Sequence, residues 1–102
     1  RLKGYRILAR RLKTPVGEID ILALRGGVLA VVEVKARADL ARALDAISPQ
    51  QWQRLARAVE WAIAHRPDLA ERALRFDAIL LARGRVPRHV PDAWRPPGSS
   101  LS

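Results

Sequence analysis

Four charged residues stand out because they occupy two neighbouring stretches whose pattern is typical of strands. Glu18 and Asp20 are two positions apart, as are Glu33 and Lys35. Side chains alternate between the faces of a strand, so each pair shares one face. Carboxylates can hold a divalent cation, and a lysine beside them can polarise or orient a water molecule. These residue types could therefore hydrolyse a phosphodiester bond with the aid of Mg²⁺ or Mn²⁺.

The turn between the two stretches decides whether the charged pairs meet. If Gly26-Gly27 forms a two-residue turn, Asp20 lies opposite Glu33 and Glu18 lies opposite Lys35. A three-residue loop would put the two carboxylates on opposite faces, and the glycine pair favours the two-residue turn. Opposed carboxylates about 4.5–5.5 Å apart at Cβ repel each other unless a cation lies between them.

A second arrangement of the same residues needs no cation. Glu18 could form an ion pair with Lys35 across the strands, with Asp20 and Glu33 on a solvated face. Charges on strands commonly occupy such faces. Spacing alone does not separate a metal site from a salt-bridged hairpin, and both interpretations stay open.

The rest of the sequence predicts a sheet that positions these residues. Turns at Thr14–Gly17 and Gly26-Gly27 divide three strand-like stretches into an antiparallel meander. Ser48 and Pro49 are typical of a helix start, and an apolar stripe continues to His65. A helix between two strands of one sheet typically makes them parallel, so we expect a mixed sheet. The expected elements are strands over 5–12, 18–24, 28–35 and 75–82, a short helix within 36–47 and a long helix over 49–65.

The chain is therefore expected to be one α/β domain with a mixed central sheet flanked by helices. Residues 1–3 would be the end of a helix that stops at Gly4. From Gly84 onward, four prolines predict irregular structure. We expect the domain to cover residues 1–95 and a disordered C-terminal tail to cover 96–102.

Composition narrows the classes of protein. The 102 residues include 19 Lys and Arg against 10 Asp and Glu, a net charge of +9. This excess favours nucleic acid as a partner, although a coding bias toward Arg and Ala would produce it too. The lack of cysteine excludes disulfides, thiolate-bound zinc and thiol nucleophiles. No apolar run approaches the roughly 20 residues that cross a bilayer, so we expect a cytoplasmic protein without a membrane partner.

Three other positions are expected to be structural. Asp77 is expected to pair with Arg75 or a backbone amide, and Trp94 to anchor the C-terminal segment. Trp52 fits the apolar stripe of the long helix. His89 has no second histidine at a metal-ligand spacing, so a metal role is not expected.

The order of the motifs resembles a known group of nucleases. Gly17–Asp20 (GEID), a short hairpin and Val32–Arg37 (VEVKAR) resemble the D…(D/E)xK core of the PD-(D/E)xK superfamily. More narrowly, the chain is similar to the YraN-like uncharacterised bacterial family. Gly4–Leu8 (GYRIL), Arg75–Asp77 (RFD) and His89–Trp94 (HVPDAW) also match. The resemblance implies a restriction-endonuclease-like core.

The resemblance also implies roles for residues of the hairpin. Asp20 and Glu33 would be ligands of Mg²⁺ or Mn²⁺, with the carbonyl of Val34 as a third ligand. Lys35 would be the catalytic lysine. Glu18 would be a further acidic member of the site.

Other parts of the family pattern lie outside the hairpin. Gln51 would face the metal from the long helix, where the family tends to carry a lysine; a solvated first turn is the alternative. Related nucleases also carry an acidic residue on a helix before the first strand. That helix is expected to be missing or truncated in this chain, so we expect the site to be incomplete. A homodimer is expected by analogy with nucleases of this fold.

Basic residues could form a phosphate-binding rim beside this site, although such a run is also typical of a solvated face. The hypothesis that follows is a metal-dependent nuclease acting on nucleic acid, in the first place DNA. Two alternatives are a catalytically inactive nucleic-acid-binding module of the same fold and a structural or interaction protein with a salt-bridged hairpin. The basic candidates are Arg10, Arg11, Lys13, Arg37 and Arg42.

Overall fold

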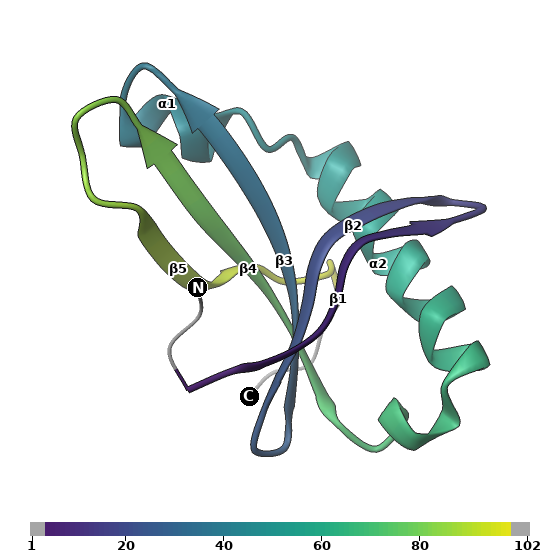
Figure 1. The fold of residues 1–102 in the computed structure, drawn as a ribbon. Coiled ribbons are helices and arrows are strands. Elements are labelled where there is room, and N and C mark those ends of the chain that lie inside the picture. The colour runs from purple at the N-terminus through teal and green to yellow at the C-terminus, as the bar shows by residue number, and fades with distance from the viewer. Residues whose placement is uncertain (1–3, 99–102) are drawn as a thin grey trace.

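A computed structural model describes residues 4–98 as a five-stranded mixed sheet with both α-helices packed on one face (Figure 1). The strands follow one another across the sheet in the order β1-β2-β3-β4-β5. The elements are β1 (Arg6–Thr14), β2 (Gly17–Arg25), β3 (Val28–Arg37), α1 (Leu40–Asp45), α2 (Pro49–His65), the 3-10 turn η1 (Pro67–Leu69), β4 (Ala73–Ala82) and β5 (Arg88–Trp94). The α/β class and the mixed sheet are confirmed.

The first three strands form the expected antiparallel meander. Thr14 closes the first turn, because its hydroxyl accepts from the Gly17 N–H at 3.1 Å and donates to the Gly17 carbonyl at 2.6 Å. In the second turn Gly26 has a φ of +56°, a conformation that favours glycine. The register of β2 on β3 runs from Arg25–Val28 to Ile21–Val32. The two-residue glycine turn is therefore confirmed.

Helix α2 begins as its sequence predicts and carries the chain across the sheet. The Ser48 side chain accepts from the Gln51 N–H at 3.1 Å, and Pro49 occupies the first turn. Its buried face packs on the sheet in one cluster with residues of β2, β3 and β4. The crossover places β4 parallel to β3, as expected. The buried side chains of α2 are Trp52, Leu55, Ala58, Val59 and Ala62.

A fifth strand occupies the region that was expected to be irregular. β5 pairs antiparallel with β4, although Pro91 interrupts it and the register shifts between Phe76 and Ala78. Trp94 holds the end of this strand: its ring stacks on Trp52 at 5.9 Å and meets Phe76 edge-on at 5.2 Å. The prediction of irregular structure after residue 84 is therefore wrong for β5, and the anchoring role of Trp94 is confirmed.

Two predictions fall at the ends of the chain. Residues 1–3 and 99–102 lie outside the described residues, and with them the predicted helix end and most of the predicted tail. Residues 96–98 are irregular chain with a turn. No helix within residues 4–98 has the length and apolar character needed to cross a membrane.

Candidate functional site

A polar pocket of about 230 Å³ lies where β2, β3 and the first turns of α2 meet. It lies beyond the end of the β2–β3 ladder that is remote from the Gly26-Gly27 turn. Three of the ten acidic residues of this basic chain line it. The charged and amide side chains of its lining are Glu18 and Asp20 from β2, Glu33 from β3, and Gln51 and Arg54 from α2.

Strands β2 and β3 stop pairing at this pocket. The last ladder pair is Ile21–Val32, and the next contact is made by a side chain: Oδ2 of Asp20 accepts from the Val34 N–H at 2.8 Å. The expected pairing of Asp20 directly across from Glu33 is therefore replaced by a carboxylate bridging the gap between the strands. Within residues 4–98, Oδ1 of Asp20 receives no hydrogen bond from the protein.

Glu33 is buried at the floor of the pocket, with 4% of its surface exposed. Oε2 of Glu33 accepts a hydrogen bond from the Gln51 amide and lies 3.4 Å from Nζ of Lys35. Of the two alternatives for Gln51, the structure has the one in which its side chain reaches the site. The hydrogen bonds that the described residues donate to Glu33 use Oε2 and leave Oε1 free.

The electrostatics of Glu33 are unusual for a carboxyl group. Burial raises the pKa of Glu33, the neighbouring Asp20 carboxylate raises it further, and Lys35 only partly offsets these effects. The pKa rises from 4.5 to about 7. Two carboxyl groups share a confined space, which disfavours both being ionised at once. Such perturbed groups in a cleft are characteristic of functional sites.

The oxygen donors in this pocket fit a hard divalent cation. Residues 4–98 hold no cluster of three His, Asp or Glu side chains with metal-binding geometry. Mg²⁺, however, usually binds through one or two carboxylates, keeps several waters and completes its shell with substrate phosphates. Asp20 and Glu33 each have one oxygen to which no group within residues 4–98 donates, and a cation between them would relieve their repulsion. These two residues are therefore the ones that could hold Mg²⁺ or Mn²⁺.

The salt-bridged hairpin is not the arrangement that the structure has. Among residues 4–98, Lys35 forms its ion pair with Glu33, not with Glu18, and Glu33 is buried instead of solvated. Glu18 is exposed at the pocket, opposite Lys13 in the β1–β2 register. Val34 meets the site through its N–H donation to Asp20.

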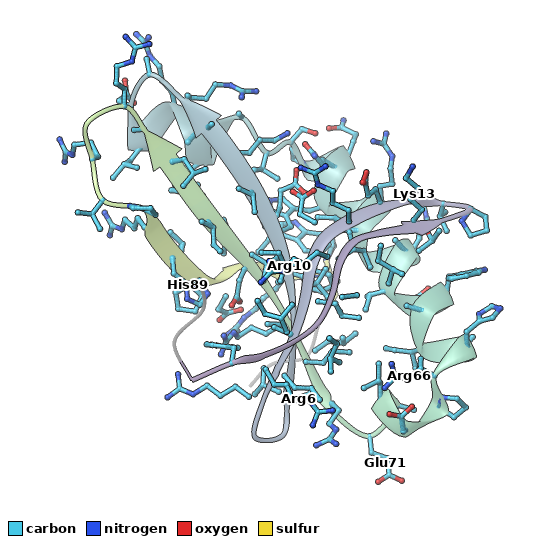
Figure 2. The ribbon with its side chains drawn as sticks, in the orientation of Figure 1. Arg6, Arg10, Lys13, Arg66, Glu71 and His89 are labelled. Atoms are coloured by element: carbon cyan, nitrogen blue, oxygen red, sulfur yellow. The ribbon has the colours of Figure 1, made fainter. Side chains whose placement is uncertain are left out.

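The five basic candidates lie in two groups. Arg10, Arg11 and Lys13 lie on β1, and Figure 2 shows Lys13 near the β1–β2 hairpin tip with Arg10 farther back along the strand. Arg37 and Arg42 lie at the α1 end of β3, where Arg42 pairs with Asp39 at 3.4 Å. The first group lies on β1 and the second on β3 and α1, and their joint role as a phosphate-binding rim stays a prediction.

One residue of the pocket was not singled out by its sequence. Arg54 lies one helical turn after Gln51 on α2, and it lines the pocket together with Asp20 and Glu33. The spacing of three residues would have placed the two side chains on one face of the helix. This spacing predicts a place for Arg54 in the pocket only if the face of α2 that meets the carboxylates is already known.

A second buried carboxylate lies elsewhere on the sheet and is fully paired. Asp77 is 0% exposed and accepts from Nε and Nη2 of Arg75, each at 2.8 Å, from His89 Nε2 at 2.8 Å and from the Asp92 N–H at 3.0 Å. Arg75 also donates to the Tyr5 hydroxyl. We refer to Tyr5, Arg75, Asp77, His89 and Asp92 as the Asp77 cluster. The predicted structural role of Asp77 is confirmed, and His89, labelled in Figure 2, belongs to this cluster.

Comparison with known proteins places the chain in a family. A UPF0102 protein of Caulobacter vibrioides is 59% identical over 92 residues, which cover 90% of this chain and 74% of that protein. A UPF0102 protein of Parvibaculum lavamentivorans is 54% identical over 96 residues, covering 94% and 72% of the two chains. The sequence profile of the uncharacterised protein family UPF0102 matches residues 1–81. The chain therefore belongs to the uncharacterised protein family UPF0102.

Proposed function

We propose that this protein is a divalent-cation-dependent nuclease that hydrolyses phosphodiester bonds of nucleic acid, in the first place DNA. The observation that carries this proposal is the pocket in which Asp20 and buried Glu33 share one space beside Lys35. Burying a carboxyl group beside a second carboxyl group is unfavourable in free energy, which argues that the protein uses the pair. A cation makes the arrangement favourable, and Mg²⁺ or Mn²⁺ suits its oxygen donors.

Each residue has a distinct task in this proposal. Asp20 and Glu33 would hold the cation, while the Val34 N–H and the Gln51 amide fix the orientation of one oxygen of each carboxylate. When bound, the cation supplies Lewis acidity toward the phosphoryl oxygen and lowers the pKa of water. Lys35, 3.4 Å from Glu33, orients the attacking water and stabilises the charge that develops on the phosphate.

The resemblance to PD-(D/E)xK nucleases supports the same reading of the site. The strand–hairpin–strand order with Asp20, Glu33 and Lys35 is the pattern on which that resemblance rests. A meander followed by a helical crossover to a parallel strand is compatible with a restriction-endonuclease-like core. The net charge of +9 favours association with a phosphate backbone.

Cleavage of circular, linear and branched DNA with Mg²⁺, Mn²⁺ or EDTA tests the proposal. We expect metal-dependent cleavage that falls by about a hundredfold or more in Asp20→Asn and Glu33→Gln, since each removes a cation ligand. Glu60→Gln, an exposed change on α2, is the matched control and should cleave as the wild type does. Equal cleavage by the wild type and Asp20→Asn would identify a contaminant and overturn the proposal.

Lys35→Met separates a role in the reaction from a role in binding. If Lys35 acts on the attacking water and the reacting phosphate, DNA affinity is retained while turnover falls. A large loss of affinity would instead make Lys35 a phosphate contact. DNA binding by the wild type without cleavage would favour the inactive binding module, and the absence of both would leave a structural protein.

A further inference from the structure

Several arginines of the described residues are paired with an aspartate, and Arg54 is not among them. Arg66, Arg75 and Arg95 each form an ion pair with an aspartate at 3.0 Å or less. Arg54 lines a pocket that contains three carboxylates, yet among residues 4–98 no carboxylate oxygen lies within 4.0 Å of its guanidinium. With respect to the part of the chain that the structure describes, the guanidinium donors are therefore available to an anion that enters the pocket.

The start of β2 leaves room for the stem of this side chain. A Cβ placed on Gly17 would lie 3.0 Å from Cγ and 3.1 Å from Cδ of Arg54, closer than ordinary van der Waals contact. The Arg54 stem thus packs directly on the Gly17 backbone. Glycine is the residue type at this position that allows the helix side chain to cross so close to the strand.

We propose that Arg54 is the phosphate-binding residue of this pocket, and that Gly17 serves to admit its side chain. The guanidinium donates to the non-bridging oxygens of the phosphodiester that lies against Asp20 and Glu33. The planar fork of arginine matches two oxygens of one phosphate, and its charge does not change near neutral pH. This inference rests on the proposed function for the identity of the ligand, a nucleic-acid phosphate.

The chemistry of the pocket requires such a group. Two carboxylates repel a phosphodiester, and a cation held by both of them would offset little more than their own charge. Lys35 is already paired with Glu33 at 3.4 Å. Arg54 is the cationic residue among the pocket lining, so it is the group that can make the pocket attractive to an anion.

The test is binding of a fluorescently labelled DNA duplex and single strand, with Ca²⁺ and with EDTA, across a salt series. Arg54→Ala should weaken binding about tenfold and reduce the salt slope by about one, and Arg54→Lys should restore part of the affinity. Arg57→Ala is the matched control, because it removes the same charge from an exposed position of α2 that does not line the pocket.

Gly17→Ala gives an independent measurement that keeps every charge. The added methyl group forces the Arg54 stem to shift by a few tenths of an ångström, so binding should weaken more in the wild-type background than in Arg54→Ala. Equal effects of Gly17→Ala in the two backgrounds would show that the glycine acts only on the β1–β2 turn, and would overturn its assigned role.

The outcomes separate this inference from the proposed nuclease activity. If the wild type cleaves DNA and Arg54→Ala binds like Arg57→Ala, the role of Arg54 is overturned while the nuclease stands. If the wild type binds without cleaving and Arg54→Ala alone loses affinity, the phosphate site stands and hydrolysis is overturned. If the wild type does not bind DNA at low salt, both proposals fail.

Discussion

Two carboxyl groups of the described residues are buried on the same sheet, and their hydrogen-bond and charge partners differ sharply. Asp77 is 0% exposed and receives hydrogen bonds from Arg75, His89 and the Asp92 N–H. Glu33 is 4% exposed and has one amide donor, a lysine at 3.4 Å and a second carboxylate as a neighbour. Burial penalises both anions, so the difference between them is in what compensates for the burial.

The pKa values follow this difference. Burial by itself would raise the pKa of Asp77, but the hydrogen bonds from Arg75, the Asp92 N–H and His89 outweigh it and hold the pKa below 3.8. For Glu33 burial and Asp20 act in the same direction, and its pKa rises to about 7. A fully compensated carboxylate is typical of structure, and an under-compensated one beside a second acid is typical of a site for a cation.

The two groups therefore contribute to stability with opposite dependence on pH. The stabilisation from Asp77 is present above its unfolded pKa of 3.8 and is lost as pH falls through its lower folded pKa. The stabilisation from the protonated Glu33 is present below 4.5 and is lost as pH rises through about 7. Substitutions of Asp77 and of Glu33 should show whether each carboxylate is fully compensated or under-compensated.

Removal of Asp77 should have the largest effect on folding. Asp77→Ala leaves Arg75 and His89 without their shared partner and releases β5 from β4, so we expect a loss of about 3–5 kcal/mol in the free energy of unfolding. Urea denaturation followed by tryptophan fluorescence measures it, since Trp52 and Trp94 stack beside these strands. Asp68→Ala, which removes an exposed ion pair with Arg66, is the control and should change little. A similar loss in both variants would contradict the structural role of the Asp77 cluster.

The same cluster explains why β5 was not predictable from its own residues. Pro91 and the neighbouring loop signals argue against a strand, and local pattern contains nothing that overrides them. β5 is held by contacts with distant positions: His89 and the Asp92 N–H meet Asp77, and the Trp94 ring meets Trp52. Such tertiary contacts outweigh local propensity and cannot be derived from alternation alone.

The site was partly predictable because a short turn sets the register of the two strands that carry Asp20 and Glu33. The glycine pair at 26–27 defines the register, and period-two alternation then brings Asp20 and Glu33 to the same place. The end of the ladder at Ile21, where Asp20 turns to the Val34 N–H, has no signal in the spacing. Arg54 was missed for a similar reason, since its relation to the pocket depends on how α2 packs across β2.

The pH dependence of stability tests the environment of Glu33 directly. Between pH 4.5 and about 7 the folded protein retains a proton on Glu33 that the unfolded chain has released, so stability falls as pH rises. We expect the wild type to lose about 3 kcal/mol relative to Glu33→Gln between pH 4.5 and about 8. Urea titrations of the two proteins over this range provide the measurement. Parallel curves would mean that the pKa of Glu33 is not raised, and that its burial and the Asp20 carboxylate are compensated.

A divalent cation should offset the loss of stability that ionised Glu33 causes, without any substitution. At pH 8, Mn²⁺ at about ten times its dissociation constant should stabilise the wild type by about 1.4 kcal/mol, roughly 6–7 °C in Tm. Asp20→Asn should lose this shift, because it removes one of the two ligands, and Glu60→Gln should retain it. Calorimetry or thermal scanning with and without EDTA measures the effect. An unchanged shift in Asp20→Asn would place the bound cation elsewhere on the protein.

A single substitution should give Glu33 a cationic hydrogen-bond donor, as Asp77 has, and so lower the pKa of Glu33. Gln51→Lys replaces the amide that reaches Oε2 of Glu33 with an ammonium group, which favours the ionised carboxylate. The pKa of Glu33 should fall, and the pH-dependent loss of stability should shrink by about 1 kcal/mol. Gln53→Lys adds the same charge to α2 from a position outside the pocket and should leave the pH dependence unchanged. If both lysines shift the curve equally, the effect comes from net charge, and the amide of Gln51 has no specific part in holding Glu33.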